Sequence, residues 1–413
     1  MFSFKELLAE DKGGKNLHLE HLEDEIINYG VEGGRAALNF LRSLRDMLAG
    51  GSRSSVNMTV KWDGAPAIFA GIDPSDGKFF VAKKSVFNVT PKLYKTTGDI
   101  DDDLSGTLNA KFKIALKELS KLGITGVLQG DLMFTDDIET QTIDGEKYYT
   151  FQPNTIVYAT PVSSNLGSIL KKAKIGVVWH TTYTGKELQS MKASFGANIS
   201  NLKKPSTVWM DDATYKDTSG KSTFTSAETD AITKILSQVG STFHKINAPK
   251  LKSFLAWQNS LTGNLSGVSL KTYNNSKVRA GEPISNPSAH AKGYEQWVID
   301  SIQKQIDKVK SDAGKKKYQN IQKEYAREAK KHSRNLEFVI RFQNLLVEAK
   351  MQIIKKLNSV KSIGTFVRTS NGFKVVNPEG YVAIDRVSGG AVKLVDRMEF
   401  SFNNFTAIKA WDK

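Results

Sequence analysis

The sequence contains no cysteine, and this absence excludes several kinds of chemistry. Without a thiol there is no disulfide framework, no cysteine nucleophile and no cysteine-ligated zinc site. A chain with no cysteine also fits a reducing compartment, so we expect a cytoplasmic protein.

Long apolar runs are absent too. No run approaches the ~18 residues that a membrane helix requires, and MFSFKELLAEDK at the N-terminus lacks the pattern of a signal peptide. We therefore expect no membrane partner. The motifs G-x-x-x-x-G-K-[ST] and G-x-G-x-x-G are also missing, which excludes a P-loop and a Rossmann turn as phosphate sites.

Acidic residues are the minority among the charged ones. Lys and Arg number 58 against 43 Asp and Glu, a net charge of +15. Residues 300–361 contain 16 basic and 7 acidic residues, so this segment carries +9 of that excess. Such a segment favours contact with a polyanion, most simply a nucleic-acid backbone. The alternative is an exposed helical surface of alternating charge.

The spacing of apolar residues changes three times along the sequence, between helical and strand-like patterns, and this predicts an α+β protein. We expect an N-terminal helical segment (1–52), a strand-rich region with one helix (53–215), a basic helical insertion (216–361) and a return to strands (362–413). Within the insertion, apolar spacing predicts four helices, and the polar stretch between two of them is predicted to be a loop. The helices are expected at 226–246, 294–311, 315–333 and 334–357, and the loop at 271–293.

The stretch VKWDGAPAIFAG places Lys61 in an apolar run that has no structural need for a charge. Burial disfavours the ammonium form of lysine, and the free amine is a nucleophile. If the strand continued, Asp63 would share a face with Lys61 and could orient or deprotonate the amine. Gly64 lets the backbone approach a ligand closely. The alternative is a surface lysine at a hairpin end.

Three later strands add the groups that a nucleotide site requires. Asp131 follows a glycine in GVLQGDLMF, Glu379 precedes a glycine in PEGYVAID, and Lys393 lies in AVKLVDR. Together they offer an acceptor for a ribose hydroxyl, a carboxylate for a divalent metal and a cation for phosphates.

KWDG, GDL, EGYVA and VKL, in this order, resemble the motifs of the covalent nucleotidyltransferase superfamily, which includes ATP-dependent DNA and RNA ligases. EGYVA followed by a lysine strand is most similar to phage RNA ligases of the tRNA-repair type. The resemblance covers roughly residues 55–185 and 363–400. It implies a ligase-type domain with antiparallel sheets, split by the helical insertion.

The resemblance assigns roles to five of these residues. Lys61 would attack the α-phosphate of ATP to form lysyl-AMP, and Asp63 would complete the catalytic motif. Asp131 stands where the family has a ribose-binding carboxylate, usually Glu. Glu379, with Asp131, would bind Mg²⁺ or Mn²⁺, and Lys393 would hold the phosphates.

Other cofactor contacts implied by the resemblance are assigned less specifically. The family has a basic residue between its first and third motifs, and here this is Lys83 or Lys84. It also has an aromatic strand that stacks on the base, and the candidates are Trp179 and Tyr183. The remaining implied nucleotide contacts are Thr59, Val60 and Gly64.

One position departs from the family pattern. Many ligases have K-x-K where this chain has Lys393-Leu394-Val395, and Arg397 is the candidate replacement for the second lysine. His180, next to Trp179, is interpreted as a packed strand residue because ligase chemistry needs no histidine.

The function implied is an ATP-dependent polynucleotide ligase, RNA-favoured, that joins 5′-phosphate to 3′-hydroxyl ends of RNA or DNA strands. If a phage encodes it, it acts in the host cytoplasm. Two alternatives stay open: a ligase that seals DNA nicks, and a degenerate ligase fold that only binds nucleic acid. The choice between ATP and GTP also stays open.

Overall fold

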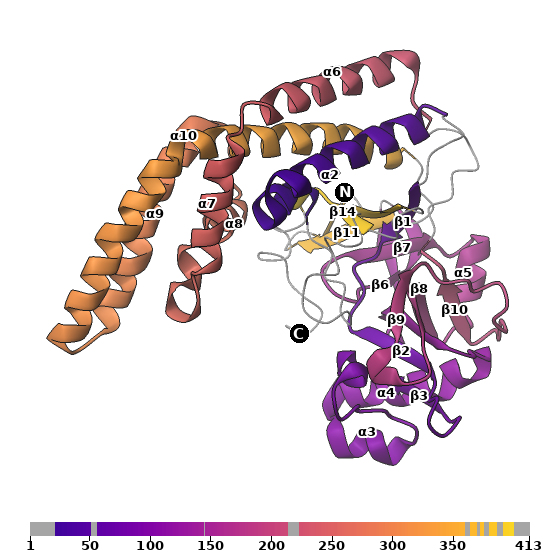
Figure 1. Cartoon of the computed structure of the whole chain (residues 1–413). Coiled ribbons are helices and arrows are strands. Elements are labelled where there is room, and N and C mark those ends of the chain that lie inside the picture. The colour runs from indigo at the N-terminus through magenta and orange to yellow at the C-terminus, as the bar shows by residue number, and fades with distance from the viewer. Residues whose placement is uncertain are drawn as a thin grey trace.

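The computed structural model describes most of the chain and shows a mixed α+β fold with antiparallel sheets and an N-terminal helix (Figure 1). For β1 up to Val60 and for most of β11 to β14, only the backbone is described. The described residues are 21–50, 56–143, 145–213, 223–359, 364–369, 372–375, 380–385 and 391–399.

The smallest sheet joins strands from the two ends of the chain. It has the order β1–β13–β14, with antiparallel neighbours. These strands are β1 (Val56–Lys61), β13 (Gly380–Asp385) and β14 (Ala391–Leu394).

The largest of the three sheets in the described residues contains β4 and β8, the strands of Asp131 and His180. Its order is β10–β8–β4–β2–β3, β9 pairs with β8, and every pair is antiparallel except β10–β8. Its strands are β2 (Ala67–Ile72), β3 (Phe79–Ala82), β4 (Val127–Phe134), β8 (Ile175–Thr184), β9 (Lys192–Phe195) and β10 (Val208–Asp211).

One face of this sheet packs on helices. Ile68, Leu128 and Trp179 share a hydrophobic core with Phe112 and Leu119 of α4. The Thr96 side chain and Asp99 form a capping box at the start of α3. The helical segments here are η2 (Lys84–Phe87), α3 (Thr97–Asp103), α4 (Gly106–Leu119) and η3 (Ser120–Leu122), and η4 (Leu188–Ser190) follows β8.

A third sheet has the order β12–β11–β7–β6–β5, and β11 reaches it from beyond the helical region to pair with β7. Its strands are β5 (Glu139–Ile143), β6 (Glu146–Phe151), β7 (Val157–Pro161), β11 (Gly364–Thr369) and β12 (Gly372–Val375), with α5 (Asn165–Leu170) after β7.

The remaining helices pack around one core that also contains Tyr381 and Leu394 of the smallest sheet. The chain of α2 breaks helical geometry at Gly30, where φ is +67°. These segments are η1 (Leu22–Asp24), α2 (Glu25–Leu48), α6 (Ser226–Phe243), α7 (Ala248–Asn259), η5 (Gly263–Val268), α8 (Leu270–Arg279), α9 (Pro287–Lys308) and α10 (Asp312–Leu357).

Two sequence predictions about these helices were wrong. The two helices expected at 315–333 and 334–357 are one continuous helix of 46 residues, α10, because no residue between them ends the apolar stripe that packs on α9 and α6. The polar stretch 271–293, expected to be a loop, contains most of α8 and the start of α9. Ser269 and Asn286 cap these helices with side-chain oxygens.

None of the helices in the described residues is long and apolar enough to cross a membrane.

Candidate functional site

The smallest sheet brings together three segments that the sequence singled out. Lys61, the last residue of β1, pairs with Gly380, which directly follows Glu379 in the chain. Thr59 pairs with Val382, and Val382 pairs with Lys393. Because paired positions share a face and alternate residues return to it, the positions of Lys61 and Lys393 belong to the same face.

Some of the predicted site residues lie outside what the structure describes. Glu379 is among these residues, as are the side chains of Thr59, Val60 and Lys393. Their predicted roles stay predictions.

Asp63 is a buried anchor whose carboxylate is held by hydrogen bonds, although the charge of Lys61 also acts on it. Strand β1 ends at Lys61, so the expected shared face does not exist. The Asp63 carboxylate accepts hydrogen bonds from Asn154 Nδ2 (2.7 Å) and from the backbone N–H groups of Thr155 and Ile156 (2.8 Å each). Its own N–H donates to the hydroxyl of Tyr158 at 2.7 Å. Burial raises the pKa of Asp63, and these hydrogen bonds oppose that effect.

We expect Asp63→Ala to lower the free energy of unfolding by about 3–5 kcal/mol, since three donors lose a charged acceptor inside the protein. Urea unfolding of the two proteins measures the difference. Asp136→Ala is the matched control, because Asp136 is exposed and its loss should change stability by less than about 0.5 kcal/mol. A cost below about 1 kcal/mol for Asp63→Ala would contradict the anchoring role.

Gly64 is required because Asp131 lies against it. A Cβ atom at position 64 would fall 2.3 Å from the Cβ of Asp131, so the backbone could not pass this close with any larger residue. Asp131 is on β4, opposite Ala67 of β2. Burial raises the pKa of Asp131 to about 7, with Asp63 adding to the rise and Lys61 and Lys84 opposing it. Asp131 is therefore within electrostatic reach of Lys61.

His180, which the sequence analysis interpreted as a packed strand residue, also lies beside Asp131. Its Nε2 lies 4.0 Å from Asp131 Oδ2, and its Nδ1 lies 2.8 Å from Thr181 Oγ1. Gln129 pairs with Thr181 but Gly130 pairs with Trp179, so His180 is the extra residue of a β-bulge. Burial and Lys61 lower the pKa of His180 to about 4, which keeps the ring neutral near pH 7.

Lys84 and Lys83, the two candidates for the basic residue, are in different surroundings. Lys84 is exposed at the start of η2, and its charge acts on Asp131. Lys83 instead forms an ion pair with Asp103 at 3.3 Å. The geometry thus favours Lys84 as the cation of this site. Together, Lys61, Lys84, Asp131 and His180 are named below as the Lys61 cluster.

The two aromatic candidates are both enclosed in hydrophobic cores, so the prediction that one of them stacks on a base does not fit the structure. Trp179 is fully buried on the face of the sheet that packs on α4. Tyr183 is 3% exposed, packs on Phe87 with ring centroids 4.6 Å apart, and donates a hydrogen bond to Gln129.

Arg397 forms ion pairs away from the Lys61 cluster. Its guanidinium lies 3.1 Å from Asp24 and 3.8 Å from Glu23, and its side chain is 12% exposed. It is therefore part of a buried ion cluster, and the prediction that it replaces the second motif lysine is not supported by its contacts. Val395, which stands in that lysine's place, is fully buried.

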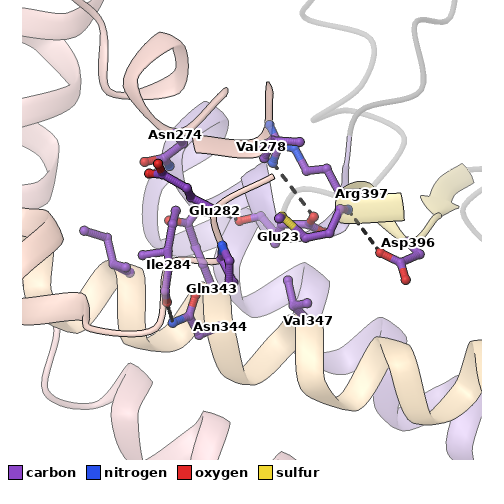
Figure 2. Close-up of a pocket in the computed structure, with 13 residues that line it drawn as sticks. Glu23, Asn274, Val278, Glu282, Ile284, Gln343, Asn344, Val347, Asp396 and Arg397 are labelled. Atoms are coloured by element: carbon purple, nitrogen blue, oxygen red, sulfur yellow. Dashed lines mark hydrogen bonds and ion pairs between the residues drawn. The ribbon is translucent and has the colours of Figure 1, made fainter. Parts of the chain in front are cut away.

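A cavity of about 250 Å³ lies beside this ion cluster, between α8, α10 and residues 396–398 (Figure 2). Its polar walls are largely bonded within the protein: Asn344 donates to the Ile284 carbonyl at 2.6 Å, and Gln343 donates to the Glu23 carbonyl at 2.9 Å. The rest is apolar. No member of the Lys61 cluster lines this cavity.

The described residues contain no group of three or more histidine, aspartate or glutamate side chains that could hold a metal ion by themselves. Among the described residues, both Asp63 and Asp131 are within electrostatic reach of Lys61, but the Asp63 carboxylate already accepts three hydrogen bonds, which leaves Asp131 as the candidate oxygen ligand. One or two carboxylates with substrate phosphates suffice for Mg²⁺, so Asp131 fits as one such ligand.

A model of a protein family described as a family of unknown function, DUF6267, matches residues 16–409. The chain belongs to this family. The match includes the Lys61 cluster, helices α6 to α10 and strands β11 to β14. No curated protein and no solved structure matches the chain.

Proposed function

We propose that this protein is an ATP-dependent polynucleotide ligase whose nucleophile is Lys61, built on a ligase-type nucleotidyltransferase domain. One observation carries the proposal: β1, β13 and β14 form a single sheet. This sheet pairs Lys61 with the residue after Glu379 and places Lys393 in the same cross-strand row as Thr59. The first and last of these segments lie more than 300 residues apart in the chain, and a nucleotide site needs all of them in one place.

The first chemical step is attack of the Lys61 amine on the α-phosphate of ATP. A P–N bond forms, the bond to the bridging oxygen breaks, and pyrophosphate leaves with that electron pair. The ammonium must first lose a proton, and Asp131 can hold it near neutral pH because its pKa is about 7. This role differs from the ribose and metal contacts that the resemblance implies for Asp131: a carboxylate that ligates Mg²⁺ cannot also hold this proton, and for this step we assign Asp131 the proton. Lys84 offsets the charge on the phosphates.

Two further phosphoryl transfers follow in the proposed reaction. A 5′-phosphate oxygen takes AMP from Lys61, and a 3′-hydroxyl oxygen then attacks that phosphate and displaces AMP. A divalent ion, when bound, would neutralise phosphate charge in each transfer. His180 is neutral and lies beside Asp131, so it adds no charge that would compete with the amine for the phosphate.

An adduct assay tests this proposal. Protein stripped of bound nucleotide with pyrophosphate is incubated with Mg²⁺ and α-labelled ATP or GTP, and then denatured. We expect label on the wild-type chain from ATP and none on Lys61→Arg, whose guanidinium stays protonated. Lys78→Arg, an exposed lysine on the neighbouring hairpin, is the matched control and should retain wild-type labelling.

Two results of that assay would change the proposal. Label from GTP alone would indicate a capping-type guanylyltransferase. If neither nucleotide labels the chain, the proposal that the protein is an enzyme is wrong. The alternative would then be a degenerate ligase fold that binds nucleic acid, which the buried Val395 in place of a motif lysine favours. If labelling succeeds, joining assays on nicked DNA, nicked RNA duplex and single-stranded RNA distinguish the two ligase alternatives.

A further inference from the structure

Helices α9 and α10 form a hairpin that reaches away from the three sheets, with its tip at residues 309–311 (Figure 1). Helix α10 has 46 residues, which at 1.5 Å per residue is about 69 Å measured along the helix axis. Tyr318, Ile321, Tyr325 and Leu336 pack its inner face into the helical core. The outer half of α10 therefore presents its other face to solvent.

That outer face carries a continuous row of cations. Lys316, Lys323, Arg327, Lys330 and Arg334 follow at spacings of 7, 4, 3 and 4 residues, and all five are exposed. At 100° per residue they fall within about 40° of one line and span about 27 Å. These five residues are called the α10 row below.

Carboxylates do not neutralise the α10 row. The acidic residues within its span, Glu324 and Glu328, lie beside the line, and Glu328 pairs with Lys331 and His332. Among the described residues, Lys330 has an ion pair with Glu295 at 4.0 Å, and the other four have no ion-pair partner. Five like charges on a rigid helix repel one another, so the arrangement favours an anionic partner of matching length.

The partner's class follows from what the row lacks. An amphipathic membrane helix would need an exposed apolar face, but the face opposite the row is packed in the core. A surface for single strands would need aromatic side chains on which bases stack, and none lies on the row. A straight row of cations matches regularly spaced phosphates, which a nucleic-acid duplex offers at one charge per about 1.7 Å of its axis.

We propose that the α10 row binds the phosphate backbone of a nucleic-acid duplex, sequence-independently, along about eight base pairs. The proposal deepens the proposed function and rests on it, since the duplex would carry the strand ends that the Lys61 cluster joins. Positions 316–334 contact backbone rather than base edges, so the row sets affinity and orientation without reading sequence.

Duplex binding by the full-length protein tests this, without nucleotide, by fluorescence anisotropy between about 50 and 200 mM salt. The probes are a DNA duplex and an RNA duplex of about 20 base pairs, longer than the row, and one single strand of equal length. The test variant is Lys316→Gln/Lys323→Gln/Arg327→Gln/Arg334→Gln. The matched control removes four exposed lysines far from α10, as Lys117→Gln/Lys171→Gln/Lys172→Gln/Lys204→Gln.

We expect the test variant to bind duplex about 10²–10³-fold more weakly near physiological salt, with a salt slope reduced by about 3–4. The control should lose less than about tenfold, and single-strand binding should fall less than duplex binding. The DNA and RNA arms show which duplex the protein prefers. Equal losses in both variants, or an equal loss for single strands, would overturn the proposal.

Two readouts keep the result interpretable. If the quadruple variant is less thermally stable than the wild type, the double variant Lys316→Gln/Arg327→Gln is measured instead. We expect its salt slope for duplex binding to be smaller than that of the wild type by about 2. Adduct formation on Lys61 involves no nucleic acid, so failure of labelling in wild-type protein and failure of the α10 row are separate outcomes. The quadruple variant should retain wild-type labelling.

Discussion

Asp131→Asn is expected to stabilise the folded protein at about pH 8 and to weaken labelling of Lys61 strongly. The ordinary pKa of 3.8 rises to about 7 in the folded state. Between these values the folded protein holds a proton that the unfolded chain has lost, so the free energy of unfolding falls as pH rises through this window. Above about pH 7 the full cost of the buried charge is present, and asparagine removes it.

The size of this gain can be bounded. A pKa difference from 3.8 to about 7 corresponds to about 4 kcal/mol. The Asp131 side chain keeps 21% of its surface exposed, so solvent screening reduces the gain to about 1–3 kcal/mol. Labelling should fall by at least about 10²-fold, because the amine loses its proton acceptor.

Urea unfolding at about pH 4 and pH 8 measures the stability of both proteins. The gain should be much smaller at pH 4, because the folded protein holds the proton there and the unfolded chain, with its ordinary pKa of 3.8, has lost it only in part. His180, whose pKa falls from 6.5 to about 4, has the opposite effect: its contribution is present above pH 6.5 and lost as pH falls to 4. Both proteins contain His180, so its effect on the free energy of unfolding cancels when the variant is compared with the wild type at the same pH. Equal gains at both pH values would contradict the assignment, and Asp136→Asn, at an exposed site, should change neither.

Lys350→Met is expected to cost about 3–5 kcal/mol of stability, because it leaves a buried carboxylate without its nearest cation. Lys350 is fully buried and its ammonium lies 2.7 Å from Glu23. Burial alone would raise the pKa of Glu23, but Lys350, then His21 and Arg397, lower it to about 2. Without Lys350, the cations left near Glu23 in the described part of the chain are more distant, Arg397 at 3.8 Å and His21 at 4.0 Å. The cluster joins η1, α10 and the segment that follows β14.

The pH dependence of unfolding gives this prediction a second test. Because the folded pKa of Glu23 is depressed below 4.5, its contribution is present above pH 4.5 and lost as pH falls towards 2. Lys350→Met should flatten that dependence. Adding Glu23→Gln should recover about 1–3 kcal/mol, since the uncompensated charge is then gone.

The matched control is Lys355→Met, an exposed lysine of the same helix, which should cost less than about 0.5 kcal/mol. A small cost for Lys350→Met, or strict additivity in the double variant, would show that Lys350 and Glu23 are not coupled.

Local patterns predicted much of the fold but erred where long-range packing decides. Strand β1 and helix α6 follow from residue spacing within short windows. Helix α8, by contrast, lies in a stretch rich in Asn, Ser and Lys whose buried Tyr273 and Val278 find their apolar partners on other elements. Polar composition within the window therefore concealed the helix.

The candidate site divides in the same way. Sequence reasoning found Lys61, Gly64 and Asp131, because a lysine and an aspartate in apolar strands have a chemical signature. It interpreted His180 only as a packed strand residue, since a β-bulge depends on the register of β8 against β4 and cannot be recognised in either segment alone. Nor does spacing show that Trp179 faces the α4 core, because its burial depends on a helix about 65 residues earlier.

The sequence by itself determined the α+β class and the basic character of the helical region, because composition and periodicity are local properties, and it supplied the candidate residues of the proposed nucleotide site. Only the tertiary structure decided which of those residues meet. The pairing of β1 with β13, the donors that occupy Asp63, the commitment of Arg397 to Glu23 and Asp24, and the free outer face of α10 depend on contacts between distant segments. Such contacts depend on the packing of the whole chain. A buried charge is stable only where an opposite charge or a hydrogen-bond donor packs against it, and a strand register is set by the neighbouring strand.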